Sequence, residues 1–146
     1  MNLGAFATAT DEEVTTWMHI RNLNNELAYS EDEQGNPDKT KPVRVKLRGK
    51  DSSAYKREVA KQLRAAQMEN QKSRGKYIKP FSEMEADNRR LLAVTTMGFE
   101  NLSQADGTAL TADDAEHVYK VAPHIAEQVS QFLEDRANFL PGSLAA

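Results

Sequence analysis

No cysteine occurs among the 146 residues, so the chain cannot form disulfide bridges or thiolate metal sites. No apolar run approaches the roughly 18 to 20 residues that a membrane-spanning helix needs. The first residues, Met1–Ala5, include no basic side chain and precede the acidic run Asp11–Glu13, which is unlike a secretory signal. We therefore expect a protein that acts in the cytoplasm of the cell that makes it, with no membrane partner.

Recognisable catalytic motifs are also missing from the sequence. It has no glycine-rich nucleotide-binding loop, no P-loop and no nucleophile elbow around a serine. The histidines His19, His117 and His124 lack the spacing of a zinc site, since Pro123 interrupts the helix between the last two. Acidic clusters fall in predicted loops and at helix starts, where they favour solvation or stabilise helix N-termini. The sequence therefore predicts no catalytic, metal or cofactor site.

Charge is distributed very unevenly along the chain. Residues 1–40 carry two bases and eight acids (−6), residues 41–79 carry thirteen bases and three acids (+10), and residues 80–146 carry four bases and eleven acids (−7). A basic middle between acidic ends can be neutralised within one subunit or between subunits of a homo-oligomer. It can also meet an anionic partner.

The basic segment 41–79 has two readings. Six of its side chains form the candidate basic surface: Arg44, Lys46, Arg48, Arg57, Lys61 and Arg64. Such a set could contact phosphates and give salt-dependent binding. However, the nearby aromatic residues are only Tyr55 and Tyr77, so platforms for stacking bases are not evident. We favour a solvated or partner-facing surface that meets acidic chain, and we do not expect nucleic acid as a partner.

The first half of the chain predicts a small antiparallel sheet. Residues 1–13 lack periodicity and are expected to form a flexible arm. Residues 14–20 and 26–29 suggest a strand and a shorter second strand, and residues 30–40 suggest an exposed loop. Residues 43–48 alternate apolar and basic side chains, which is typical of a strand with one buried face.

Two long helices are expected next. One begins after a cap among residues 51–53 and runs to the early seventies, with a narrow buried stripe of Tyr55, Val59, Leu63 and Ala66. The other is entered at Pro80-Phe81-Ser82, with Ser82 and Glu85 as a capping box and Phe81 as a staple. It is expected to bury Met84, Leu91, Leu92 and Thr95, and to end at Met97 before Gly98.

Two shorter helices complete the prediction. Thr111 and Asp114 are spaced as a box that opens a short helix with Ala115, Val118 and Tyr119 inside. Pro123 starts the last helix, which buries Ile125, Val129, Phe132 and Leu133 and ends at Pro141-Gly142. The fold class is therefore α+β, with a sheet of two to three strands followed by about four helices. We expect a single domain over residues 14–140 and a tail over residues 141–146.

The end of the last helix has two readings as well. At about 100° per residue, Arg136 falls on the apolar side, where a charge is costly unless it is paired or reaches water. Asp135 and Arg136 are therefore candidates for an ion-pair network that closes the fold. The other reading is a partner-docking edge near Gln128, with Phe139 and Leu140 as exposed anchors.

Several short runs follow one another in a distinctive order: Lys50–Tyr55, Met97–Leu102, Asp106-Gly107, Ala115, Tyr119, Pro123–Ile125, Glu127–Val129 and Asp135–Leu140. In this order and spacing they resemble the tail assembly chaperones of siphophages, over most of residues 14–140. The sequence departs from the family pattern at Phe99, where we expect tryptophan, and residues 2–11 do not align.

The resemblance implies a non-catalytic phage protein in the host cell cytoplasm. Such a chaperone binds the tape-measure protein, keeps it soluble and helps to recruit tail-tube subunits, so both proteins are expected partners. The candidate partner-binding residues are Phe99, Gln128, Phe132, Phe139 and Leu140. Two other functions remain open: a small structural protein of the virion tail or neck, and a nucleic-acid-binding regulator that uses residues 41–79.

Overall fold

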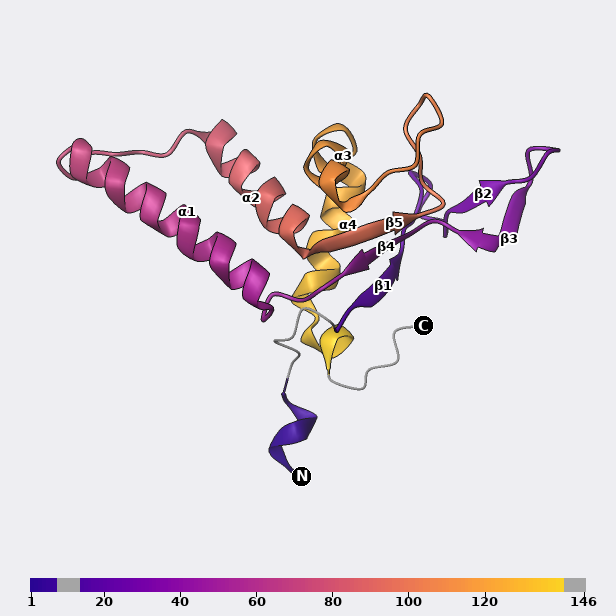
Figure 1. The fold of residues 1–146 in the computed structure, drawn as a ribbon, viewed down its shortest axis with the longest axis horizontal. Coiled ribbons are helices and arrows are strands. Elements are labelled where there is room, and N and C mark those ends of the chain that lie inside the picture. Colours follow the sequence, from indigo (N-terminus) through magenta and orange to yellow (C-terminus); the bar gives the residue numbers. More distant parts are fainter. Residues whose placement is uncertain (8–13, 141–146) are drawn as a thin grey trace.

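A three-stranded antiparallel sheet organises the protein. The computed structural model describes residues 1–7 and 14–140 (Figure 1), so the predicted tail at 141–146 and part of the predicted arm lie outside it. The strand order is β1-β4-β5, and a separate hairpin is formed by β2 and β3. The strands are β1 (Thr16–His19), β2 (Tyr29–Glu31), β3 (Pro37–Pro42), β4 (Arg44–Leu47) and β5 (Thr96–Glu100).

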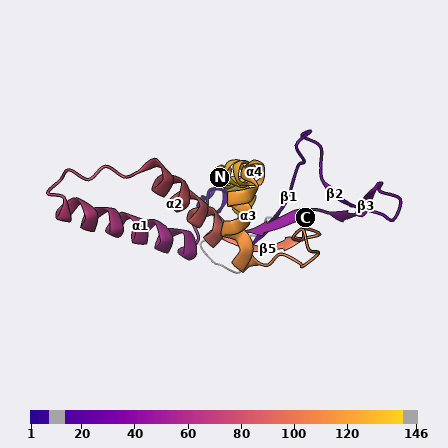
Figure 2. The ribbon, with the colours of Figure 1, turned by 90° about the horizontal axis from the view of Figure 1, so that it is seen from above.

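Within residues 1–7 and 14–140, four α-helices accompany the sheet and confirm the α+β class. They are α1 (Ser53–Lys72), α2 (Phe81–Thr95), α3 (Ala115–Val121) and α4 (Pro123–Glu134). The described part of the chain also contains the short 3-10 helices η1 (Leu3–Ala5), η2 (Ala112–Asp114) and η3 (Arg136–Phe139). Seen from above, α1 and α2 project to one side of the sheet and the β2–β3 hairpin to the other (Figure 2).

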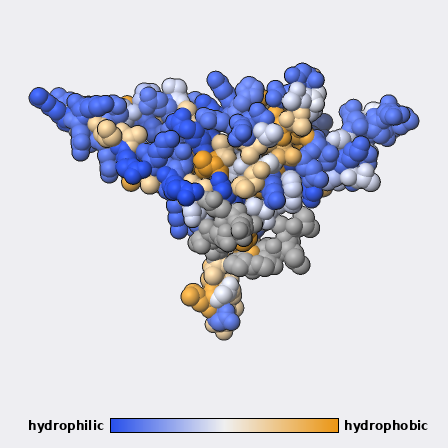
Figure 3. All heavy atoms as spheres, in the orientation of Figure 1, coloured by the Kyte–Doolittle hydropathy of each residue, from blue (hydrophilic) through white to orange (hydrophobic). Residues whose placement is uncertain are grey.

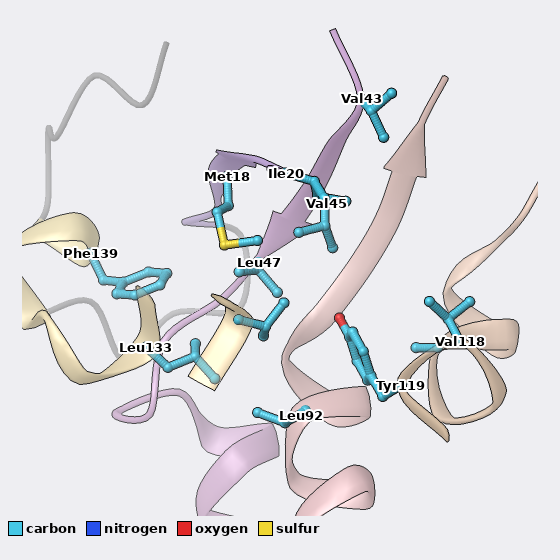
Figure 4. Close-up of a cluster of buried hydrophobic side chains, with 12 residues drawn as sticks. Met18, Ile20, Val43, Val45, Leu47, Leu92, Val118, Tyr119, Leu133 and Phe139 are labelled. Carbon is cyan, nitrogen blue, oxygen red and sulfur yellow. The ribbon is translucent and has the colours of Figure 1, made fainter. Parts of the chain in front are cut away.

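The alternating pattern of β4 directs one face of the sheet into the core. Val45 and Leu47 are fully buried, whereas Arg44 and Lys46 lie on the opposite face. Figure 4 shows Val45 and Leu47 together with buried side chains of β1 and the helices. The largest fully buried side chains, Tyr119 and Phe139, come from α3 and η3. The core is thus closed by elements from the C-terminal third of the chain.

Local capping signals placed three helix starts correctly. The Ser52 hydroxyl accepts a hydrogen bond from the Tyr55 amide at the start of α1. Thr111 and Asp114 form the predicted capping box before α3, and Pro123 occupies the first turn of α4. These signals depend on neighbours in the sequence, which is why they are readable there.

The predicted loop at residues 30–40 is wrong, because β2 and β3 form a hairpin there. The turn between them is held by the Asp32 carboxylate, which accepts from the Gln34 and Asn36 amides, and by Gly35 with φ +80°. Both strands are polar and mostly exposed, so they show no alternating apolar pattern. The short strand expected at residues 26–29 begins only at Tyr29.

The predicted end of the second long helix is also wrong. α2 stops at Thr95, and Met97 and Gly98 belong to β5, which pairs with β4. Pro80 is the N-cap, so Ser82 and Glu85 lie inside the helix and do not form the box, and Phe81 is 74% exposed. A strand late in the sequence therefore completes the sheet.

The last helix is shorter than predicted. α4 ends at Glu134, and Asp135 adopts extended backbone angles and caps η3 by accepting from the Ala137 amide. The helical projection that placed Arg136 on the apolar side of α4 therefore does not apply. The predicted stop at Pro141-Gly142 lies outside the described residues.

A buried hydrogen bond between β5 and α3 gives a first prediction. The Thr96 hydroxyl donates to the Leu92 carbonyl oxygen and so accepts from the Tyr119 hydroxyl, 2.6 Å away. We expect Tyr119→Phe to lower the free energy of unfolding by about 1 kcal/mol at neutral pH, because only one of the two bonds of Thr96 is lost.

The same tyrosine should make stability depend on high pH. Burial raises the pKa of Tyr119 from 10.0 to about 12, against a smaller lowering by Thr96. The raised pKa means that the folded state holds the phenol proton more tightly than the unfolded state does. The resulting contribution to the free energy of unfolding is fully present below pH 10 and is lost as the pH rises toward 12. Urea unfolding of both proteins across this range should show a steeper decline for the wild type, since phenylalanine cannot ionise. Parallel declines would contradict the prediction.

Candidate protein-binding surface

The apolar stripe predicted to be buried on α1 is exposed instead. Val59 is 42% exposed and Leu63 59% exposed, while Tyr55 and Ala66 are half-buried. The prediction of a buried stripe is therefore wrong. Its cause is visible in Figure 1, where α1 leaves the body of the protein next to α2 alone. We call residues 53–95 the α1–α2 hairpin.

Between the two helices lies an open groove of about 830 Å³. On the α1 side it is lined by Glu58, Gln62 and Ala65, so the contact of α1 with α2 is made largely through polar and small residues. Gln62 crosses the groove and donates to the Asp87 carbonyl oxygen, 2.9 Å away. Ala66 of the predicted stripe also lines the groove, whereas Tyr55, Val59 and Leu63 do not.

A buried carboxylate holds the linker 73–80 against α2. The Asp87 side chain is 13% exposed and forms ion pairs with Lys79 of the linker and with Arg90 one turn later. Sequence reasoning did not single out this residue. Its only signal is an acidic residue within the apolar positions of α2, between Met84 and Leu91.

Further large apolar side chains are exposed along the hairpin. Ile78 in the linker is 87% exposed, and Phe81 and Met84 at the start of α2 are 74% and 49% exposed. On α1, Met68 is 59% exposed. Figure 3 shows small apolar patches among hydrophilic residues over this end of the molecule. The prediction that Met84 is buried is therefore also wrong.

The predicted partner-binding aromatic residues belong to the interior. Phe139 is 1% exposed, so it is not an exposed anchor. Phe132 is half-buried, and its ring meets that of Phe139 edge-on, with 5.7 Å between the ring centres. Phe99 packs against the core, and its ring centre lies 6.4 Å from that of Tyr119. Leu140 is half-buried. The docking edge proposed for these residues is therefore mostly core.

Gln128, the remaining member of that set, and the ion-pair candidate Arg136 make bonds within the chain. Gln128 accepts from the Arg21 amide and donates to the Arg21 carbonyl oxygen, which ties α4 to the end of β1. Arg136 pairs with Asp51 at 2.9 Å, not with Asp135. The Asp51 carboxylate raises the pKa of Arg136 by its hydrogen bond and its charge. η3 is thus fastened to the start of α1.

The basic residues do not form one continuous surface. Arg44 and Lys46 lie over the Trp17 ring on the outer face of the sheet, at 4.6 and 5.8 Å from its centre. Arg48, Arg57 and Lys61 line a small hollow of about 290 Å³ beside α1, and Arg64 is exposed one turn further along.

Several bases of segment 41–79 pair with acids that follow it in the chain. Arg44 contacts Glu100 at 2.5 Å, Lys50 pairs with Glu134, and Lys79 pairs with Asp87. The Lys50 ammonium group lowers the pKa of Glu134 through its hydrogen bond and its charge. Ion pairs within the chain thus neutralise part of the positive charge of residues 41–79.

Two histidines also have structural partners. His19 Nε2 lies 2.7 Å from the Ala28 carbonyl oxygen, and His124 Nε2 lies 2.9 Å from that of Asn22. Within residues 1–7 and 14–140, no three histidine or acidic side chains gather as metal ligands. None of the helices in these ranges combines the length and apolar character needed to cross a lipid bilayer.

Comparison of the chain with protein-family models, with curated proteins and with solved structures gave no match. The α1–α2 hairpin is therefore defined as a candidate site by its own geometry alone.

Proposed function

We propose that the protein is a non-catalytic tail assembly chaperone that binds the phage tape-measure protein through the α1–α2 hairpin. The order of sequence runs that resemble siphophage chaperones suggests the class of protein. The observation that carries the proposal is the set of exposed apolar side chains on a projecting hairpin, among them Leu63, Ile78 and Phe81. A long helical client exposes apolar surface until tube subunits enclose it, and such surface is kept soluble by contacts of this kind.

The charges of the hairpin suit the same task. Residues 53–95 carry ten bases and five acids, a net charge of +5. A strongly charged surface keeps a complex with an apolar client soluble and repels other complexes of the same kind. We place the protein in the host cell cytoplasm, with the tail-tube protein as a second partner recruited to the complex.

Co-expression with the tape-measure protein tests this function. The wild-type chain should move the client into the soluble fraction, and a variant with Leu63→Ser, Ile78→Ser and Phe81→Ser should reduce the soluble client about tenfold or more. The reason is that central apolar contacts supply most of the affinity of such interfaces. Western blotting of soluble and pelleted client measures the outcome.

A matched control keeps the test specific to the hairpin. Leu23 and Val121 are 85% and 64% exposed on other parts of the molecule. The variant Leu23→Ser with Val121→Ser should solubilise the client like the wild type. A client that pellets equally with and without the wild-type chain would overturn the proposed function, and equal losses in both variants would overturn the hairpin as its surface.

A further inference from the structure

The outward face of α1 combines an apolar ridge with a basic border. The ridge consists of Tyr55, Val59 and Leu63, which are spaced four residues apart and so follow one another along one side of the helix. Lys56 and Arg64 are both exposed, and neither lines the groove or the small hollow that α1 shares with α2. From Tyr55 to Leu63 the ridge is about 12 Å long, enough for about two turns of a partner helix.

The acidic residues of α1 lie on its other side. Glu58 and Glu69 both line the groove toward α2, and Glu69 contacts Lys72 at 3.8 Å. The charged residues of α1 that line neither the groove nor the small hollow are therefore Lys56 and Arg64, and both are basic. A partner with basic side chains along that border would be repelled, whereas one with acidic side chains would be attracted.

We propose that the outward face of α1 binds an amphipathic helical segment whose apolar ridge is bordered by acidic side chains. This inference rests on the proposed function and specifies which segments of the client are held. The apolar ridges of the two helices pack together, as in other helix-on-helix recognition. The charges of Lys56 and Arg64 then select among the amphipathic segments of the client.

Synthetic helical peptides provide the probe. Three peptides share one leucine ridge and carry glutamate, glutamine or lysine along its borders, and each is titrated against the full chain by fluorescence anisotropy. We expect the glutamate peptide to bind about 3- to 30-fold more tightly than the glutamine peptide, as two exposed ion pairs allow. The lysine peptide should bind most weakly. The preference should shrink as salt is added, because exposed charges are screened.

Charge reversal is the decisive variant. Lys56→Glu with Arg64→Glu should make the lysine peptide the tightest binder. The control Arg74→Glu with Lys76→Glu changes the net charge equally in the linker, away from the ridge, and should keep the preference for the glutamate peptide. Val59→Ser with Leu63→Ser should weaken all three peptides, and circular dichroism checks that these exposed changes leave the helices intact.

The outcomes separate this inference from the function on which it rests. Equal affinity for the three peptides, or the same reversal in the linker control, overturns the outward face of α1 as the selective site. So does self-association of the chain that Val59→Ser with Leu63→Ser abolishes, because a second copy then covers the ridge. Binding of an oligonucleotide through Lys56 and Arg64 without peptide binding overturns it too. In each case the co-expression result decides separately on the chaperone function.

Discussion

Phe139→Ala is expected to lower the free energy of unfolding by about 3–5 kcal/mol, the range for removing a large aromatic side chain from a core. Phe139 is 1% exposed, and its ring points from η3 toward Met18 and Leu47 (Figure 4). Phe132 packs edge-on against it. The backbone of Gly49 also closes on the ring, since a Cβ atom there would lie 2.9 Å from Phe139 Cγ.

The size of this effect follows from how the ring is enclosed. Sheet, helix and loop backbone surround it, so the cavity left by alanine can collapse only partly. Urea unfolding followed by circular dichroism measures the change in free energy. The matched control is Phe81→Ala on the hairpin, where the ring is 74% exposed. That substitution should change stability by no more than about 0.5 kcal/mol.

The comparison of the two phenylalanines also decides between two roles of the C-terminal segment. If Phe139 were a partner anchor, its loss would weaken client binding and leave stability nearly unchanged. The buried position predicts the reverse: a destabilised protein whose remaining folded fraction still binds the client. Equal stability of Phe139→Ala and Phe81→Ala would contradict the core position of Phe139.

Local signals in the sequence predicted local features well. The alternation in β4, a cap within residues 51–53, the Thr111–Asp114 box and Pro123 each act on neighbouring residues, and each was placed correctly. β5 was missed because it follows α2 directly, without a turn. Its strand character comes from pairing with β4, about fifty residues earlier in the chain, and such pairing has no local signature.

The candidate site was harder to predict than the fold. Periodicity shows that Val59 and Leu63 share a face of α1, but it does not show whether another element covers that face. Similarly, projection of Phe139 onto a longer last helix places it at an edge with Gln128 and Asp135, which suggests exposure. Its burial depends on η3 turning back onto the sheet, where the Thr16 hydroxyl donates to the Asn138 carbonyl oxygen, 2.5 Å away.

Asp87→Asn is expected to lower the free energy of unfolding by about 1–3 kcal/mol, because it removes a carboxylate that holds two cations. The Asp87 side chain is 13% exposed, and its partners Lys79 and Arg90 are 27% and 41% exposed. Because both cations reach water in part, the cost should stay below that of a fully buried pair. Asparagine has nearly the same shape as aspartate, so the change in the free energy of unfolding reports the loss of the negative charge.

The location of this effect is as informative as its size. Lys79 is held to α2 by Asp87, so its release should loosen the linker 73–80 while the β1-β4-β5 sheet stays protected in hydrogen exchange. Glu85→Gln is the control, since Glu85 is exposed two residues earlier on the same helix and should change stability little. When Lys79 is first replaced by methionine, Asp87→Asn should lower the free energy of unfolding by less than it does in the wild type. The difference measures the interaction between Lys79 and Asp87. Additive costs in that double-mutant cycle, or an Asp87→Asn protein as stable as Glu85→Gln, would show that the carboxylate does not fasten the hairpin.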